Sequence, residues 1–517
     1  TTVYDVYLRI PAPPGTDLRE TVKAIESLTG SKDVETQLAA FFAAASAGEL
    51  PVMQGVGSDV LTSFYKADLV QSGAVRAAAR GVRTWPNGTL LPHALGFTGP
   101  ITAEQWPTAR RRGLAMDAVI GQSGLESAYD DLLRGQDGRV LVNTGFDGAV
   151  RRTVPLREAA PGATLVLTVD SALQKELQNA LLSQIEVLRT TKAAGAGREC
   201  RAGAAVVVDV QTGGILAAAS VPGFDLNRYR SDYAALSADA AAPLLDRVCQ
   251  GLYAPGSAFK PAVAAAALTA GIDPAATVNC TGRYGFYSGY QPGCLQYGHG
   301  GPVDLRTALE YSCNIFFYDA GRRVGIDMLG QYARALGLGE KTGIELAGEQ
   351  AGVVAGPEYT ASVGGTWYEG SVLSAAIGQE NNRFTPLQLA HMVATLVGGG
   401  DRWQVHLLQK VAGEAPREKV RLGKVNLSPG NVAAIKEGML AVTQSGSLAA
   451  AFQSLPVQVG AKTGSAQVDG EETSNAVLVC FAPYEDPEIA LAVVVEQGGS
   501  GSSLGTVAAQ VIQAYVQ

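Results

Sequence analysis

The chain has 517 residues, of which 47% are hydrophobic and only 17% are charged, and its formal net charge is -8. This length exceeds what one hydrophobic core usually supports, so two or more domains are expected, and the apolar content excludes global disorder. The negative charge argues against a protein that binds nucleic acid, because such proteins usually carry a basic patch or domain.

The first 160 residues alternate between helical patterns and loops. Helices are expected from Asp17 to Leu28 and from Asp33 to Ala47, with few strong strands around them. The turn-forming composition of Arg157 to Gly162 then marks a domain boundary. We therefore expect an irregular α+β region before this boundary.

The remaining residues indicate an antiparallel sheet assembled from both ends of a second domain. Helices are expected at Ser171 to Leu188 and at Thr506 to Tyr515. Four β-rich runs form two expected hairpins, Ala204 to Val210 with Ile215 to Ser220, and Ala476 to Ala482 with Ile489 to Glu496. The helical patterns between these hairpins predict a helical insertion, so the fold class is α+β.

The first candidate chemical motif places a serine and a lysine at the start of a helix. Ser257 and Lys260 follow the turn Tyr253 to Gly256 and open an Ala-rich segment that runs to Ala270. Three residues apart, the two side chains share one helix face. A serine becomes nucleophilic when a base takes its proton, and a lysine serves as that base if burial or a second ammonium lowers its pKa.

The second motif, Ser312-Cys313-Asn314, is expected in a loop between two helices. A hydroxyl and an amide two residues apart can project into one cleft, where the hydroxyl relays a proton and the amide holds a substrate amide. Cys313 is interpreted as a small residue that fills space, because no second cysteine is adjacent in the sequence.

The third motif, Lys462-Thr463-Gly464-Ser465, follows an alternating segment typical of a strand. Gly464 would let an extended substrate lie close to that strand. The Lys462 ammonium and the hydroxyls of Thr463 and Ser465 would suit a substrate carboxylate.

Similar motifs occur elsewhere without the same context. Ser63 and Lys66 repeat the Ser-x-x-Lys spacing without a Pro-Gly turn, and Lys341-Thr342-Gly343 lies in a Gly- and Glu-rich turn. Gly501-Ser502-Ser503-Leu504-Gly505 matches the nucleophile turn of α/β-hydrolases, but no acidic residue or histidine follows it. We expect none of these copies to form the site.

In chain order, the three motifs resemble those of the penicillin-recognising serine acyltransferases. Further segments resemble parts of class B penicillin-binding proteins, namely Gly121 to Glu126, Tyr129 to Gly135, Gly378-Gln379 and Thr385 to Leu389. The resemblance implies a pedestal domain at residues 89–160 and a transpeptidase domain at residues 161–517. The latter would contain an antiparallel sheet flanked by helices and an all-helical subdomain, while residues 1–88 have no assigned type.

The resemblance also implies a reaction. Ser257 would attack the bond between the last two D-alanines of a peptidoglycan stem peptide, form an acyl-enzyme and release D-alanine. Lys260 would act as the base, Ser312 would pass a proton to the leaving amine, and Lys462 would orient Ser312 and add positive charge. The substrate-binding residues would be Asn314, Thr463, Gly464 and Ser465. The amine of a second stem peptide would then take the acyl group, and β-lactams would acylate Ser257 as substrate mimics.

The same resemblance sets expectations for partners and location. It implies a membrane polymerase as partner, and an anchor ahead of Thr1 that holds the domains on the extracytoplasmic face of the cell membrane. No cofactor, metal ion or nucleic acid is expected. A D,D-carboxypeptidase and a non-catalytic β-lactam sensor of the same fold stay open as alternatives.

Cys280 and Cys294 bracket a Gly- and Tyr-rich loop that leads to His299 and the second motif. An exported domain allows a disulfide between them, and free thiols are the next alternative. A zinc site with His299 is a third alternative, for which the sequence offers no evident fourth ligand.

Overall fold

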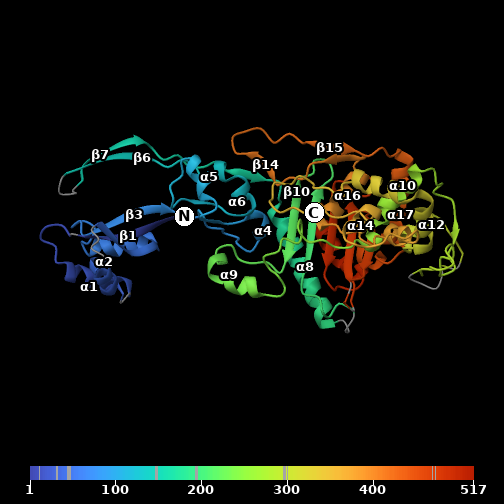
Figure 1. Ribbon diagram of the computed structural model, residues 1–517, viewed down its shortest axis with the longest axis horizontal. Coiled ribbons are helices and arrows are strands. Elements are labelled where there is room, and N and C mark those ends of the chain that lie inside the picture. The colour runs from blue at the N-terminus through green and yellow to red at the C-terminus, as the bar shows by residue number, and fades with distance from the viewer. Residues whose placement is uncertain are drawn as a thin grey trace. The chain divides into compact units, whose positions relative to one another are not determined.

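Figure 1 shows the computed structural model of the chain. The described residues are 1–10, 12–30, 33–43, 48–145, 150–191, 196–294, 299, 301–468, 470–471 and 473–517. They form two compact units, Thr1–Pro86 and Asn87–Gln517. Every helix in this described part of the chain is too short or too polar to cross a membrane.

The first unit packs three helices against a three-stranded antiparallel sheet with the strand order β2-β1-β3. Its elements are β1 (Thr2–Ile10), α1 (Leu18–Thr29), α2 (Val34–Ala43), β2 (Gly48–Val56), α3 (Ser58–Lys66) and β3 (Val75–Gly81). Leu8, Ile25 and Phe64 are fully buried between the sheet and the helices. Asp17 caps α1 by accepting hydrogen bonds from two backbone N–H groups of its first turn.

Both helices expected in this unit are present, but the expectation of few strands was wrong. The sheet pairs segments that are distant in sequence, such as Leu8 with Val75, and local patterns do not reveal such pairing. The second helix ends at Ala43, and its predicted continuation through residues 44–47 lies outside the described residues.

The second unit begins with short elements that connect into the main domain. They are α4 (Pro92–Leu95), β4 (Thr98–Pro100), α5 (Trp106–Arg111), β5 (Val119–Gly121), α6 (Gly124–Ala128), α7 (Asp130–Leu133), β6 (Arg139–Thr144), β7 (Val150–Arg157) and β8 (Leu165–Leu167). The buried carboxylate of Asp130 accepts hydrogen bonds from the Gly121 N–H and from Arg112, which fixes this irregular region. The domain boundaries at residues 88 and 160 stay predictions.

A five-stranded antiparallel sheet with the order β10-β9-β18-β17-β16 forms the centre of the second unit. Its strands are β9 (Gly203–Asp209), β10 (Ile215–Val221), β16 (Gly460–Ala466), β17 (Asn475–Ala482) and β18 (Ile489–Val495). β9 pairs with β18, with Ala205 opposite Val493, so the two predicted hairpins join into one sheet. The expected α+β fold, with a sheet built from both ends of the domain, is therefore confirmed.

Helices cover both faces of this sheet. The terminal helices α8 (Ser171–Thr191) and α19 (Gly505–Val516) pack on one face, where Val207 and Leu491 contribute to the core. The opposite face, to which Val206 and Ala492 contribute, lies against α16 (Pro386–Val397). Because successive residues of a strand point to opposite faces, strands that are buried on both sides are apolar throughout.

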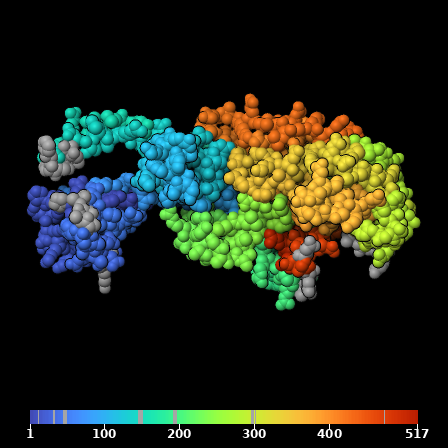
Figure 2. All heavy atoms as spheres, in the orientation of Figure 1, coloured from blue at the N-terminus to red at the C-terminus, as the bar shows by residue number. Residues whose placement is uncertain are grey.

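The helical insertion lies between β10 and β16. Its elements are α9 (Tyr229–Ala238), η1 (Gly256–Phe259), α10 (Lys260–Thr269), β11 (Val278–Asn279), β12 (Pro302–Val303), α11 (Leu305–Glu310), α12 (Asn314–Val324), α13 (Ile326–Ala335), α14 (Pro357–Ser362), α15 (Ser371–Ala376), β13 (Asp401–Trp403), β14 (Leu408–Val411), β15 (Arg421–Lys424), α17 (Pro429–Gln444) and α18 (Ala449–Phe452). Nine consecutive residues of α10 are buried, so this alanine-rich helix is surrounded by its neighbours. In Figure 2 the insertion, coloured green through orange, forms much of the visible surface of this unit, and the C-terminal residues, coloured red, appear only as a small patch.

Two adjacent leucines of α8 test how much the packing on the sheet stabilises this unit. Leu181 is fully buried, whereas Leu182 is 44% exposed. We expect Leu181→Ala to lower the free energy of unfolding by about 2–5 kcal/mol, because it removes buried methyl groups and leaves a cavity. Leu182→Ala should cost less than about 1 kcal/mol. Urea unfolding followed by circular dichroism measures both, and equal losses would contradict this packing.

Candidate active site

The three motifs meet at one cleft of about 750 Å³ in the second unit. The cleft is lined by residues from η1, from the loop between α11 and α12, and from the edge strand β16. The lining residues that the sequence singled out are Ser257, Ser312, Asn314, Thr463, Gly464 and Ser465. Segments more than 200 residues apart in the printed sequence thus share one cavity.

Ser257 lies on the short helix η1, which leads directly into α10. Its side chain is half-buried in the cleft wall and makes no hydrogen bond with any described residue. The turn before it is tight, since Gly256 has φ 51° and its N–H donates to the Gly378 carbonyl oxygen at 3.0 Å. A Cβ on Gly256 would lie 2.8 Å from the Ser465 carbonyl oxygen, so glycine allows this turn to approach β16.

Lys260 is the first residue of α10 and is fully buried. Its Nζ donates to the Ser312 carbonyl oxygen at 2.8 Å, to Ser312 Oγ at 3.1 Å and to Asn314 Oδ1 at 2.7 Å. Burial disfavours the charged amine and lowers the pKa of Lys260 to about 7, although the nearby Cys313 and Cys294 oppose this shift. An uncharged amine able to take a proton is therefore present near neutral pH.

Ser312 and Asn314 lie on either side of the start of α12. Ser312 has φ 57°, a left-handed conformation that is uncommon for a residue with a side chain. Non-glycine residues in this region store about 1–3 kcal/mol of strain and cluster at functional sites. Asn314 is buried, and its Nδ2 donates to the Gly293 carbonyl oxygen at 3.4 Å, so its amide is fixed from two sides.

The third motif lies on β16, the edge strand beside β17. Lys462 is fully buried behind the cleft wall, and its Nζ donates to the Thr463 carbonyl oxygen at 3.0 Å. Burial, with a further contribution from the charge of Lys260, holds the pKa of Lys462 well below its usual value. A Cβ on Gly464 would lie 2.5 Å from the Pro255 carbonyl oxygen, so only glycine lets β16 pack this closely on the turn before Ser257.

The structure therefore brings all eight predicted site residues to one region. Lys260 links the first motif to the second through hydrogen bonds, and β16 brings the third motif against η1. The chemical role of each residue stays a prediction. The arrangement offers a serine hydroxyl, an amine with a lowered pKa, a second hydroxyl and a row of strand groups that can bind an extended ligand.

The copies of the motifs that we set aside hold ordinary local contacts. Ser63 Oγ donates to the Asp59 carbonyl oxygen within α3 of the first unit. Thr342 donates through its backbone and its hydroxyl to the Glu349 carboxylate, both at 2.6 Å. Ser503 Oγ donates to the Ser500 carbonyl oxygen at 2.7 Å.

Sequence reasoning missed several residues of the cleft. The lining also includes Glu310, Tyr318, Gln379, Ser445, Gly446, Ser447, Gln467, Ser474, Ser500 and Ser502. Gln379 stood in a segment that resembled the transpeptidase domain, and Ser502 lies in the Gly501–Gly505 copy that we had expected to stay outside the site, whereas the others carry no local signal. The buried Glu310 accepts a hydrogen bond from Ser445 Oγ at 2.6 Å and thereby joins α11 to the end of α17.

Comparisons with known proteins identify the family of the chain. Residues 203–516 match the penicillin binding protein transpeptidase domain, and residues 1–167 match the penicillin-binding protein dimerisation domain. The chain is 31% identical to the peptidoglycan D,D-transpeptidase MrdA of Acinetobacter baumannii, over 86% of this chain and 67% of that protein.

Solved structures show the same similarity. Pseudomonas aeruginosa PBP2, crystallised in complex with WCK 5153, is 31% identical with a TM-score of 0.71, covering 84% of this chain and 90% of that one. A chain of a peptidoglycan synthase complex, whose structure concerns the coordination of polymerization and crosslinking, is 28% identical with a TM-score of 0.82. The match covers 100% of this chain and 87% of that chain.

The lowered pKa of Lys260 has a measurable effect on stability. Between pH 7 and pH 9 the folded protein loses the Lys260 proton while the unfolded chain retains it, so stability rises with pH. Relative to Lys260→Met, the wild type should gain about 2 kcal/mol of unfolding free energy over this range. Urea unfolding at a series of pH values measures the difference.

The exposed Lys175 of α8 provides a control, because Lys175→Met should leave the pH dependence of the wild type unchanged. A difference between wild type and Lys260→Met that stays constant from pH 7 to pH 9 would show that Lys260 keeps an ordinary pKa.

Proposed function

This chain belongs to the class B penicillin-binding proteins and is a peptidoglycan D,D-transpeptidase, and we propose that Ser257 is its nucleophile. The observation that carries this assignment is the fully buried Lys260 amine, which is bonded to Ser312 and Asn314 and lies one helical turn from Ser257. A lysine serves as a general base only when its environment lowers its pKa, and burial provides that condition here.

In the first half of the reaction, Lys260 takes the proton of Ser257. The Ser257 oxygen then attacks the carbonyl carbon between the last two D-alanines of a stem peptide. The backbone N–H groups of Ser257 and Ser465 stabilise the oxyanion, and one such donor contributes on the order of 3 kcal/mol in other enzymes. The C–N bond breaks, Ser312 passes its proton to the leaving amine and regains one from the protonated Lys260 to which it is bonded, and D-alanine departs.

In the second half, the amine of another stem peptide attacks the acyl carbon and forms the amide bond of the crosslink. The ester bond to Ser257 breaks, and the proton that the amine loses passes through Lys260 to the Ser257 oxygen. Thr463 and Ser465 present hydroxyls to the terminal carboxylate of the donor, and Asn314 holds its amide, while the backbone of Gly464 lines the cleft between the two hydroxyls.

The Lys462 amine is buried and does not line the cleft. A substrate carboxylate in the cleft favours the charged form of Lys462. The positive charge then orients Ser312 and offsets the negative charge of the substrate.

The same site would be acylated by β-lactams, which present a strained amide to Ser257 and leave a stable acyl-enzyme. We propose further that the chain acts on the extracytoplasmic face of the cell membrane beside a membrane polymerase. The similar chain of the peptidoglycan synthase complex supports this partner, because that complex couples polymerization to crosslinking.

Labelling by a fluorescent penicillin tests the nucleophile. Ser257→Ala should abolish covalent labelling, because it removes the hydroxyl oxygen that forms the acyl-enzyme. Ser63→Ala and Ser503→Ala are matched controls and should label like the wild type. Mass spectrometry of the adduct locates the modified residue, and labelling that persists in Ser257→Ala would overturn the assignment.

Turnover of a donor peptide tests the reaction class. With a stem peptide ending in D-alanyl-D-alanine and an amine acceptor, the wild type should release D-alanine and form the crosslinked product in equal amounts. Chromatography of the products measures both. Release of D-alanine without crosslinking would identify a carboxypeptidase instead. A protein that is acylated by penicillin but turns over no donor would be a sensor.

A further inference from the structure

Among the described residues that line the cleft, Glu310 carries the only carboxylate. Glu310 ends α11 two residues before Ser312, and its side chain is only 5% exposed. One carboxylate oxygen accepts a hydrogen bond from Ser445 Oγ at 2.6 Å, and the other accepts one from Arg306 Nη1 at 3.1 Å. The proposed reaction assigns no role to this carboxylate.

The hydrogen bond from Ser445 connects Glu310 to a further part of the cleft lining. Ser445 follows the last residue of α17, and Gly446 and Ser447 continue along the cleft. The two chain segments also pack closely, because a Cβ on Gly446 would lie 3.2 Å from the Glu310 carbonyl oxygen. The end of α11 and the end of α17 therefore meet at the cleft, next to the second motif.

The helix α17 is also attached to the strand that carries the third motif. Thr443 Oγ1 donates to the Val459 carbonyl oxygen at 2.6 Å, immediately before β16 begins at Gly460. α17 packs on β16, which belongs to the central sheet. The Glu310 carboxylate thus joins the end of α11 to an element that the sheet holds in place.

A buried carboxylate between two segments contributes more to their geometry than to stability. The cost of removing the ion from water offsets much of the gain from its partners, and apolar side chains of similar size often stabilise such a contact as well. Hydrogen bonds to a carboxylate are directional, and they fix the distance between the groups that they join. The contact of Glu310 with Ser445 therefore fixes the spacing of α11 and α17.

We propose that Glu310 is a positioning residue that fixes Ser312 relative to the end of α17. Lys260 holds Ser312 through hydrogen bonds to its carbonyl and hydroxyl oxygens. The φ of 57° at Ser312 is a strained conformation that persists only where the surrounding structure determines it, and Glu310 fixes the chain two residues earlier.

This inference rests on the proposed function, in which Ser312 passes a proton to the leaving amine. Proton transfer requires hydrogen-bond distance between donor and acceptor. A displacement of about 1 Å at a reacting group can cost on the order of 100-fold in rate. Loss of the Glu310 contact should therefore slow the chemical step and leave the initial binding of the ligand unchanged.

Acylation kinetics of the full chain with a fluorescent penicillin test this role. In Glu310→Ala, we expect the acylation rate at saturating penicillin to fall about 10–100-fold, with the half-saturating concentration unchanged. Glu310→Gln keeps an oxygen that accepts from Ser445 Oγ and should retain most of the wild-type rate. Glu437→Ala is the matched control, because Glu437 is the second carboxylate beside Arg306 and is 62% exposed. This control should be acylated at the wild-type rate.

Ser445→Ala removes the same hydrogen bond from its other end and covers the case in which Glu310→Ala does not fold. It should slow acylation in the same way. The double variant should be no slower than the slower single variant, because both changes remove one interaction. A variant that only folds poorly would label a smaller fraction of its molecules at the wild-type rate, whereas we expect complete labelling at a reduced rate.

Several results would overturn the positioning role. They are a wild-type rate in Ser445→Ala or in folded Glu310→Ala, a change in the half-saturating concentration alone, and independent, multiplicative effects of the two substitutions. A wild-type chain that penicillin does not label would instead count against the proposed function.

Discussion

The burial of one lysine amine is the constraint on which the active site depends. Lys260 has no exposed surface, and it is the hydrogen bonds to Ser312 and Asn314 that satisfy its amine. An isolated ammonium in such a place is costly, so the protein favours the neutral amine, and the same property makes the lysine a base. In the proposed mechanism this desolvated group determines the reactivity of Ser257, and its hydrogen bonds hold the loop that carries the second motif.

The central sheet supplies the rigid frame for this arrangement. Because β16 pairs along its whole length with β17, Lys462 and Ser465 have fixed positions relative to the turn before Ser257. Gly464 and Gly256 remove the side chains that would otherwise keep the strand and the turn apart. The helical insertion is attached to the sheet at both ends, so its loops reach the cleft from a fixed base.

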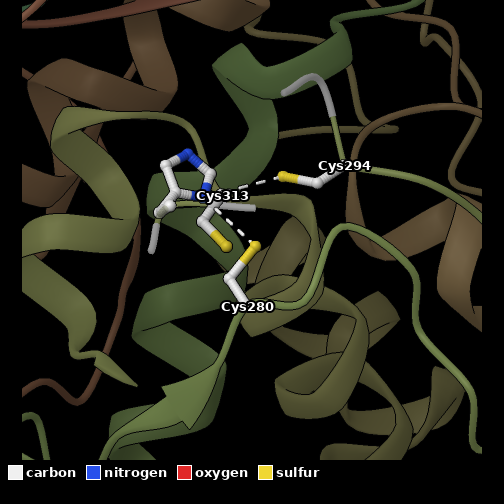
Figure 3. Close-up of side chains that lie close together, drawn as sticks. Cys280, Cys294 and Cys313 are labelled. Carbon is white, nitrogen blue, oxygen red and sulfur yellow. Dashed lines mark hydrogen bonds between the residues drawn. The ribbon is translucent and has the colours of Figure 1, made fainter. Parts of the chain in front are cut away.

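Much of the site could be predicted from the sequence because its chemistry lies in short motifs with strong local context. The Pro-Gly turn before Ser257 and the strand pattern before Lys462 distinguished these motifs from their copies. Long-range pairing could not be predicted in the same way. The first sheet joins Leu8 to Val75, and the cleft lining includes Ser445, Ser447 and Ser474, which no local pattern marks. The surroundings of the Cys313 thiol are the clearest case, since only tertiary packing brings Cys280 and Cys294 beside it (Figure 3).

The pairing of β9 with β18 also governs how the protein can be made. Ala205 and Val493 are about 290 residues apart, so this part of the sheet has a very high contact order. Until β18 has been synthesised, the apolar edge of β9 has no neighbour on that side. An unpaired strand edge of this kind is prone to aggregation. A stop codon shortly before β18 would leave every motif residue in place and still prevent the enzyme from assembling.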